Sequence, residues 1–177
     1  MEISHYLHKW STEQEEEFMR SILTKSIAAL ALGAAVSVPI MAAAESPEEK
    51  AVKARRGYYQ LVLHNAGPLF GMAKGDVAYN AERAMTSANN LKALSGMNNA
   101  SLFPAGSDNE ALPGKTRALP KIWADFPGVG EKAQAFKTAI DGLVANAGGG
   151  LDSLRGAVGP LGASCKGCHD NYRAKDF

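Results

Sequence analysis

Both cysteines of the chain lie in one short segment near its C-terminal end, Cys165-Lys166-Gly167-Cys168-His169. An α-helix turns by about 100° per residue, so Cys165, Cys168 and His169 would share one face of a helix. Two thiols on that face can form thioether bonds with the vinyl groups of a haem, while the adjacent imidazole binds the iron. This C-x-x-C-H spacing predicts one covalently bound haem c, with Cys165 and Cys168 as attachment points and His169 as axial ligand.

Three other uses of the two cysteines fit the sequence less well. A thioredoxin-like redox pair is expected near a β-α-β pattern, and the sequence shows none. A disulfide at this spacing inside a helix is disfavoured because a helix does not present the geometry that the bond needs. A zinc site needs further ligands, and His64 is the only other histidine beyond residue 44.

Helices must carry this segment, and the first of them is predicted to begin at Ser46 and to stop at Gly75. Ser46 can cap the helix, Pro47 suits its first position, and Glu49 can complete a capping box. Gly75 is a typical C-terminal stop, and Pro68 is expected to bend the helix near its end. The residues that fall on one side at helical spacing are Arg55, Tyr59, Val62, Ala66, Leu69 and Phe70.

A second helix is predicted to start after Asn80 and to stop at Gly96, followed by a long connection over residues 97–119. Its inward-facing residues are expected to be Ala84, Met85, Ala88, Leu91 and Leu94. A third helix ends before Gly148 and has an unclear start, because Pro127 and Gly128 leave room for a short preceding turn of helix. The apolar residues assigned to it are Ala133, Phe136, Ile140, Leu143 and Val144.

A fourth helix is predicted from about Asp152 to Arg173, bent or broken near Gly159-Pro160. Because no run of alternating β-branched residues suggests a sheet, the expected fold class is all-α. Four helices with one long connection indicate an antiparallel four-helix bundle, with the haem attached to the C-terminal helix.

Residues 19–44 have the layout of a secretory signal peptide. Arg20 and Lys25 form a short basic region, and an apolar run over residues 27–41 leads to three alanines ending at Ala44. A membrane anchor is the alternative, but the run is shorter than the ~20 residues that a spanning helix needs. Cleavage near Ala44 and export to the periplasm, an oxidising compartment, are therefore predicted.

Residues 1–18 do not fit a signal peptide, because residues 13–17 carry four glutamates where a basic region is expected. We expect translation to start at Met19, which would make residues 1–18 a wrongly assigned extension. A genuine N-terminal extension is the alternative. The domain that remains, residues 45–177, is then the folded haem protein.

The composition excludes several classes of protein. The 177 residues carry 19 Lys and Arg against 18 Asp and Glu, and removing 44 of them leaves 133 residues with 16 and 13, a charge of +3. Such a small charge argues against a nucleic-acid partner. A hydrophobic fraction of 46% is too high for a disordered chain.

A C-x-x-C-H motif on the last helix of a four-helix bundle resembles the cytochrome c′ family, whereas common small single-haem cytochromes carry the motif near the N-terminus. The resemblance covers residues 46–177. It also rests on the spacing of Arg55 and Tyr59, on Lys74-Gly75, Ser95-Gly96-Met97, Leu102-Phe103 and Lys115-Thr116-Arg117, and most closely on the stretch from Gly162 to Arg173. It implies a homodimer formed through the first two helices.

In the resembled family, the residue four after the first-helix arginine determines the sixth iron position. Low-spin relatives have a methionine ligand there, while cytochromes c′ have a bulky residue that does not bind. That position is Tyr59 here, so the resemblance implies an open, five-coordinate iron whose distal face the ring crowds. His64 would point some 140° away from Tyr59 on a helix and is interpreted as a surface or interface histidine. An ordinary core aromatic is the alternative role for Tyr59.

Three arginines complete the predicted site. The resemblance implies that Arg173, one turn beyond His169, passes along the proximal side of the haem. Arg55 and Arg117 are candidates for pairing with the haem propionates, which suit bidentate guanidinium contacts. A solvated surface arginine is the alternative for each.

These observations predict a periplasmic, high-spin haem protein that binds NO and CO and buffers or scavenges NO. The main alternative is an electron-transfer cytochrome whose redox partner the sequence does not identify. Enzymatic turnover of NO ranks last, because no general acid and base accompany the haem motif. No membrane partner is expected after signal cleavage.

Overall fold

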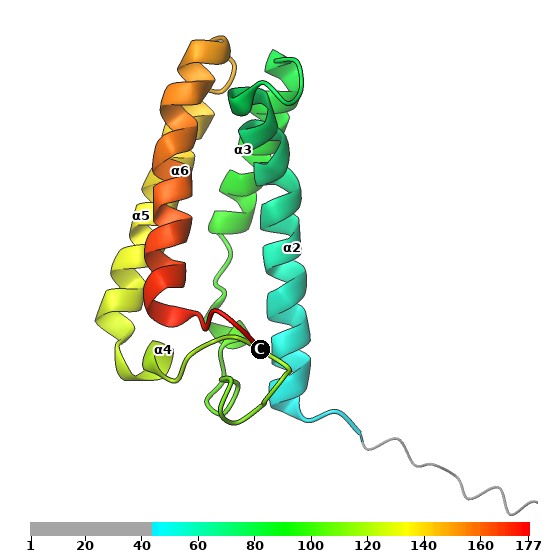
Figure 1. Cartoon of the computed structure of the whole chain (residues 1–177), viewed down its shortest axis with the longest axis vertical. Helices are drawn as coiled ribbons and strands as arrows, with labels where there is room; N and C mark the ends of the chain where they lie inside the picture. Colours follow the sequence, from blue (N-terminus) through cyan, green and yellow to red (C-terminus); the bar gives the residue numbers. More distant parts are fainter. Residues whose placement is uncertain (1–43) are drawn as a thin grey trace, which may run out of the picture. The chain divides into compact units, whose positions relative to one another are not determined.

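The computed structural model describes residues 44–177, which form an antiparallel bundle of four long helices (Figure 1). A short helix and a 3₁₀ turn lie in the connection between the second and third long helices. The elements are α2 (Pro47–Lys74), α3 (Ala81–Ser95), η1 (Ala100–Leu102), α4 (Lys121–Ala124), α5 (Phe126–Asn146) and α6 (Leu151–Tyr172). This confirms the predicted all-α, four-helix fold. The predicted extension and signal peptide fall on residues outside the described range, apart from Ala44.

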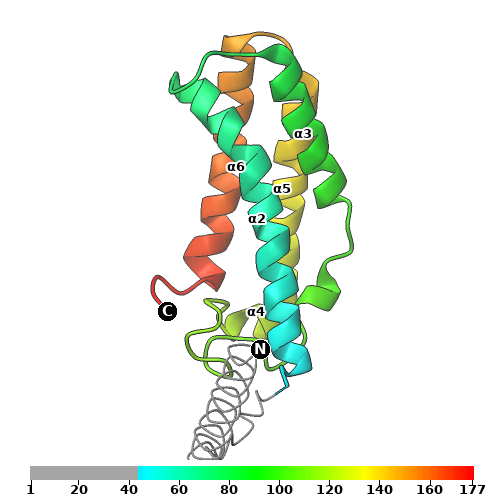
Figure 2. The ribbon, with the colours of Figure 1, turned by 90° about the vertical axis from the view of Figure 1, so that its right-hand side faces the viewer.

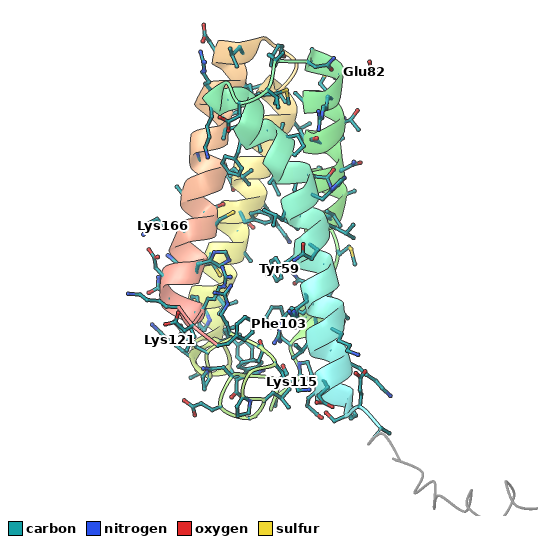
Figure 3. All side chains as sticks on the ribbon, turned by 45° about the vertical axis from the view of Figure 1, so that its right-hand side comes forward. Tyr59, Glu82, Phe103, Lys115, Lys121 and Lys166 are labelled. Carbon is teal, nitrogen blue, oxygen red and sulfur yellow. The ribbon has the colours of Figure 1, made fainter. Side chains whose placement is uncertain are left out.

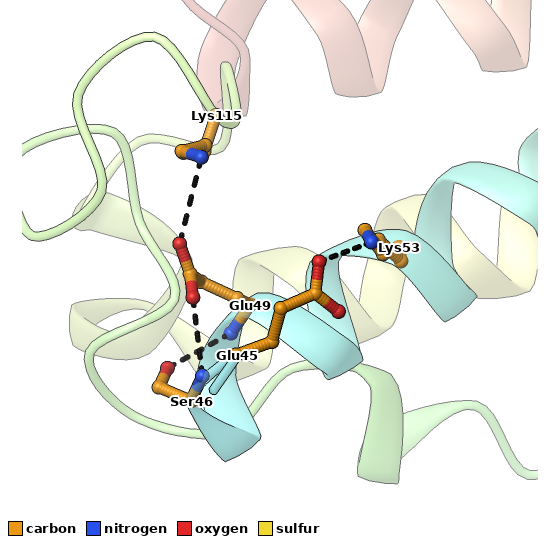
Figure 4. Close-up of polar contacts among 5 residues, drawn as sticks. All are labelled: Glu45, Ser46, Glu49, Lys53 and Lys115. Atoms are coloured by element: carbon orange, nitrogen blue, oxygen red, sulfur yellow. Dashed lines mark hydrogen bonds and ion pairs between the residues drawn. The ribbon is translucent and has the colours of Figure 1, made fainter. Parts of the chain in front are cut away.

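The ends of α2 follow the predicted signals. The Glu49 amide donates to Ser46 Oγ at 3.2 Å, and the Ser46 amide donates to Glu49 Oε2 at 3.1 Å (Figure 4). This reciprocal pair satisfies two amides that the first turn leaves without helical partners. At the other end, Gly75 adopts φ 88°, a left-handed conformation that favours glycine. The helix continues through Pro68 without a break.

The remaining long helices begin at side-chain caps or at glycine. Asn80 Oδ1 accepts from the Arg83 amide at 2.8 Å at the start of α3, and Asp125 Oδ1 accepts from the Gly128 amide at 3.1 Å at the start of α5. The expected turn of helix before α5 is α4. The last helix was predicted to be bent or broken near Gly159-Pro160, and α6 is not broken there, because it continues through Pro160.

The main hydrophobic core lies along the bundle axis, and we call it the bundle core. Its fully buried aliphatic side chains come from all four long helices and include Leu69, Leu91, Ile140, Leu143, Leu154 and Leu161. Met85 was predicted inward but is 48% exposed. Val144, one of the apolar residues assigned to the third helix, is 39% exposed. Met85 instead lies over the loop between α5 and α6. Its sulfur is so close to Gly148 of that loop that a Cβ at Gly148 would lie only 2.6 Å from it.

A second, smaller apolar cluster lies where the connection passes the end of α6, and we call it the base cluster. Its buried members are Ala118, Ile122 and Tyr172, against which Phe103, Trp123, Val129 and Cys168 pack. In both ribbon views α4 and the neighbouring connection lie at the end of the bundle where α6 ends (Figures 1 and 2). None of the described helices combines the length and apolarity needed to span a bilayer.

Candidate functional site

The last three turns of α6 carry the predicted haem ligands. Cys165 and Cys168 are half-buried free thiols, and burial raises the pKa of both. His169 is an exposed residue. Partial desolvation of its imidazole lowers its pKa, the positive charge of Arg117 lowers the pKa further, and the negative charge of Asp170 raises it. A lowered pKa favours the neutral imidazole, which is the form that binds iron.

Tyr59 of α2 faces these residues from the other side of the bundle. Its ring is 45% exposed, and Figure 3 shows the side chain directed into the space between α2 and α6. Burial raises the pKa of the phenol to about 12, and the nearby Cys168 adds to the rise. Tyr58 packs edge-on against Tyr59 with ring centroids 5.0 Å apart, and its hydroxyl donates to the Leu94 carbonyl at 3.2 Å. Tyr58 therefore supports one side of the Tyr59 ring, and the ring is directed into the space between α2 and α6.

Arg55 is buried on α2, one turn before Tyr59, and only 5% of it is exposed. Its Nη1 donates to the Leu102 carbonyl and Ser107 Oγ at 3.1 Å each, and its Nη2 donates to the Ser107 carbonyl at 2.8 Å and Thr116 Oγ1 at 2.9 Å. Within residues 44–177 all of these hydrogen-bond acceptors are uncharged. Burial lowers the pKa of Arg55. Arg55 therefore links the long connection over residues 97–119 to α2 by hydrogen bonds. Its positive charge forms no ion pair with a carboxylate of residues 44–177.

Phe103 extends this arrangement toward α6. The Arg55 guanidinium carbon lies 4.7 Å from the centroid of the Phe103 ring, and that ring is tilted against Trp123 at 6.4 Å. The sequence predicts no role for Phe103 at the site, because an aromatic residue in a loop carries no positional signal.

The other two predicted arginines lie at the end of α6. Arg173 Nη1 is 3.4 Å from His169 Nδ1, as expected for a residue one turn further along the helix. Arg117 Nη1 donates to the Lys175 carbonyl at 3.0 Å, and its guanidinium carbon lies 5.2 Å from the Phe177 ring centroid. The structure therefore groups Arg117 with the chain's last residues and not with the hydrogen bonds of Arg55.

A short antiparallel bridge between Ala118 and Arg173 fixes this grouping. The Leu119 amide donates to the Tyr172 carbonyl at 3.0 Å, and the Ala174 amide donates to the Arg117 carbonyl at 2.8 Å. The bridge holds the connection beside the segment that bears His169. Sequence patterns could not reveal it, because two isolated hydrogen bonds leave no periodicity.

A surface groove of the described residues lies elsewhere. It runs between α5 and α6 with a volume of about 980 Å³, and its lining includes the small residues Ala135, Ala139, Gly142, Gly156 and Ala163. None of the predicted site residues lines it. The candidate chemistry therefore belongs to the space between α6 and α2.

The residues present fit a covalently bound haem. Two reduced thiols and an imidazole share one face of α6, a partly exposed tyrosine ring faces them, and a buried cation lies one turn from that ring. Residues 44–177 contain no group of three or more His, Cys, Asp and Glu side chains that could hold a metal ion. The donor set on α6 matches haem c.

Known proteins share both the sequence and the fold. The family model described as Cytochrome C′ matches residues 50–173. A cytochrome c′ of Cereibacter sphaeroides is 39% identical over 134 residues, which cover 76% of this chain and 89% of that protein. The solved structure of a cytochrome c′ from Rhodobacter sphaeroides superimposes with a TM-score of 0.71 at 39% identity, covering 72% of this chain and 98% of that one.

Two further solved structures bear on ligands and assembly. One is a nitric oxide complex of a cytochrome c′ variant from Alcaligenes xylosoxidans, with a TM-score of 0.63 and 37% identity over 72% of this chain and 97% of that one. The other is a cytochrome c′ with ligand-controlled dimer dissociation, with a TM-score of 0.66 and 30% identity over 75% of this chain and 100% of that one. The family match, the identities and the shared bundle lead to one conclusion: this chain belongs to the cytochrome c′ family and binds haem c covalently.

Proposed function

We propose that this protein is a periplasmic cytochrome whose five-coordinate iron binds nitric oxide and carbon monoxide. Tyr59 carries the proposal, because its side chain is directed from α2 into the space beside the helix that bears His169. Its pKa of about 12 keeps the phenol protonated, and a protonated phenol is a poor ligand for iron. The nitric oxide complex of a relative supports the choice of gas.

The other residues that could supply a sixth ligand within residues 44–177 are poorly placed. Met72 is 1% exposed inside the bundle core, and its sulfur accepts from the Asn80 amide at 3.3 Å. Met97 is 53% exposed in the loop that follows α3. His64 is exposed on α2, away from the Tyr59 side of the helix.

In this proposal Cys165 and Cys168 hold the haem and His169 binds the iron from the proximal side. The bound haem supplies an iron that takes up a diatomic gas and exchanges one electron. Arg55 contributes a buried positive charge one turn from Tyr59, which attracts a nearby propionate through its field, since its four Nη hydrogens already have protein acceptors. Arg173 Nη1 lies 3.4 Å from His169 Nδ1 and would restrict access to the proximal side of the haem. The Tyr59 ring would have to move aside for a distal ligand.

An absorption spectrum of the reduced holoprotein, with and without CO, tests the proposal. We expect a broad high-spin Soret band that sharpens and intensifies on CO addition. Sharp low-spin α and β bands that do not respond to CO would overturn the open site and favour the electron-transfer alternative. Tyr59→Met is the positive control, since it introduces a sulfur ligand and should give the low-spin spectrum. Tyr59→Phe is the matched variant that should remain high-spin.

We also propose that a second copy of the chain packs on α2 and α3. Leu61 is 54% exposed on α2, and its carbonyl accepts from Asn65, whose side chain in turn accepts from Asn90 of α3. Leu61 therefore lies near the seam between these helices, where an apolar contact can form. A relative with ligand-controlled dimer dissociation supports this assembly. Light scattering should give a dimer mass for the wild type and a monomer mass for Leu61→Glu, and a monomeric wild type at micromolar concentration would overturn it.

Periplasmic export is the last part of the proposal. The described fold begins at the Ser46 capping box, two residues after the predicted cleavage site at Ala44. Cleavage there would release a chain whose first helix is already capped. The mass of the exported holoprotein should correspond to residues 45–177 plus one haem, and retention of residues 19–44 would contradict export with cleavage.

A further inference from the structure

Tyr172, the last residue of α6, lies one turn after Cys168 and makes a contact that the haem motif alone does not require. Its ring is 4% exposed, and its hydroxyl donates to Asp125 Oδ2 at 2.6 Å. Asp125 is 47 residues away in sequence, between α4 and α5. The hydrogen bond therefore joins the haem-bearing end of α6 to the corner where α5 begins.

Asp125 is itself held in place by a second contact. While Oδ2 accepts from Tyr172, Oδ1 accepts from the Gly128 amide at 3.1 Å and caps α5. The hydrogen bond to Tyr172 is the largest cause that lowers the pKa of Asp125, and the same bond raises the pKa of Tyr172 to about 12. At neutral pH the pair is thus a neutral donor and a charged acceptor, which makes a short, strong hydrogen bond.

Gly128 supplies the space for this arrangement. A Cβ at that position would lie 2.3 Å from the Tyr172 hydroxyl and 2.5 Å from Asp125 Oδ2. Any larger residue would displace the phenol or the carboxylate. The Tyr172–Asp125 hydrogen bond therefore requires a glycine at position 128, where the start of α5 meets the end of α6.

The base cluster connects the Tyr172–Asp125 hydrogen bond to α2 through packed side chains. Tyr172 and Cys168 both contact it, and within it the Trp123 indole donates to the Phe103 carbonyl at 3.1 Å. Phe103 in turn lies under the Arg55 guanidinium at 4.7 Å. The end of α6 is therefore connected through packed side chains to the helix that carries Tyr59.

We infer that the Tyr172–Asp125 pair positions the haem: it fixes the last turn of α6, and so sets the orientation of the His169 imidazole toward the iron. This inference rests on the proposed role of His169 as proximal ligand. Tyr172 acts here through the helix it ends and is a positioning residue. Loss of its hydroxyl should leave the bundle folded and the imidazole less well oriented.

The test compares Tyr172→Phe with Tyr79→Phe in the ferrous holoprotein. Tyr79 is a matched control, because its hydroxyl donates to the Ala147 carbonyl at 2.8 Å and accepts from the Gly150 amide at 3.0 Å at the opposite end of α6. Thermal unfolding should show a lowered Tm for both variants. The iron–histidine stretching band in the resonance Raman spectrum should shift and broaden for Tyr172→Phe alone.

Gly128→Ala provides a second route to the same result, because its Cβ displaces the pair without removing either polar group. We expect it to reproduce the band change of Tyr172→Phe. An unchanged band in Tyr172→Phe, with a Tm loss like that of Tyr79→Phe, would reduce the pair to a stabilising contact and overturn the inference. A low-spin wild type without a five-coordinate iron–histidine band would instead overturn the proposed function, so the two failures are distinguishable.

Discussion

The bundle core and the base cluster are held together in different ways. The bundle core joins aliphatic side chains from four helices at regular helical spacing, and its stability comes from burial. The base cluster joins aromatic rings from a connection, a four-residue helix and the end of α6. Hydrogen bonds from Trp123 and Tyr172 fix two of those rings, and the Arg55 guanidinium carbon lies 4.7 Å from the centroid of the third, Phe103.

This difference separates folding from haem geometry. Regular packing tolerates small side-chain changes as long as volume is retained, whereas a hydrogen bond depends on one donor and one acceptor. Damage to the bundle core should therefore lower stability throughout the domain. Damage to the base cluster should alter the haem environment at a smaller cost in stability.

The largest expected effect comes from the bundle core. Leu91→Ala removes a fully buried side chain of α3 and should lower the free energy of unfolding by about 2–5 kcal/mol. The absorption spectrum of the folded fraction should stay unchanged. Denaturant titration followed by helical circular dichroism measures the loss. Met97→Ala, at a position 53% exposed, is the control and should change stability by about 0.5 kcal/mol or less.

Arg55→Met should have the next largest effect and a different signature. The variant leaves the buried Ser107 and Thr116 oxygens without their charged donor, at a cost of about 1–3 kcal/mol. Loss of a cation near the haem should also lower its reduction potential, which a redox titration measures. Arg55→Lys keeps the charge and should restore the potential more fully than the stability. An unchanged potential in Arg55→Met would contradict the attraction between Arg55 and a propionate.

A third, smaller effect is pH dependence from the Tyr172–Asp125 pair. The folded pKa of Tyr172 is about 12, above its unfolded value of about 10. Its contribution to stability is complete below pH 10 and is lost as the pH rises from 10 through 12. The lowered pKa of Asp125 works in the opposite sense, so its contribution is present above its ordinary value and is lost as the pH falls through the folded one.

Denaturation of wild type and Tyr172→Phe across this pH range measures both effects. The variant should lose less stability than the wild type at each extreme, while Tyr79→Phe should follow the wild-type slope. Tyr59, whose pKa is also about 12, leaves some alkaline slope in every variant that retains it. Parallel curves for wild type and Tyr172→Phe would show that the pair is not coupled to folding.

The smallest effect is expected at the start of α2. Ser46→Ala removes the acceptor of the Glu49 amide and should cost about 1 kcal/mol. Glu49 Oε1 also forms an ion pair with Lys115 Nζ of the connection at 3.6 Å (Figure 4). Because Lys115 is exposed, Lys115→Ala should change stability by less than Ser46→Ala. A Tm comparison of the two variants checks this order, and equal losses would give the surface ion pair more weight than we assign.

The sequence was sufficient to predict the parts of the fold that depend on local signals. Ser46 and Glu49 form the predicted capping box, and Asn80 caps α3 as predicted. Such signals are visible because the interacting residues are three or four positions apart. The C-x-x-C-H motif belongs to the same class, since its geometry lies within one helix.

The parts that escaped prediction depend on residues far apart in sequence. Tyr172 and Asp125 are 47 residues apart, and Arg55 meets Thr116 across 61 residues. Met85 has the spacing of a core residue but lies over Gly148, because a loop and not a helix covers that side of α3. The assignments of Tyr59, Arg55, Arg117 and Arg173 to roles at the haem remain predictions, and the experiments above test those of Tyr59 and Arg55.

The two-bond bridge at Ala118 and Arg173 also has a mechanical consequence. Tension applied at the C-terminus would load the Ala174 amide and the Arg117 carbonyl before it reached His169. Because the bridge is antiparallel and lies beyond the helix, it would part before α6 unwound. A purification tag or surface tether fused after Phe177 should therefore leave the haem spectrum unchanged, which makes that end suitable for attaching the protein to a surface.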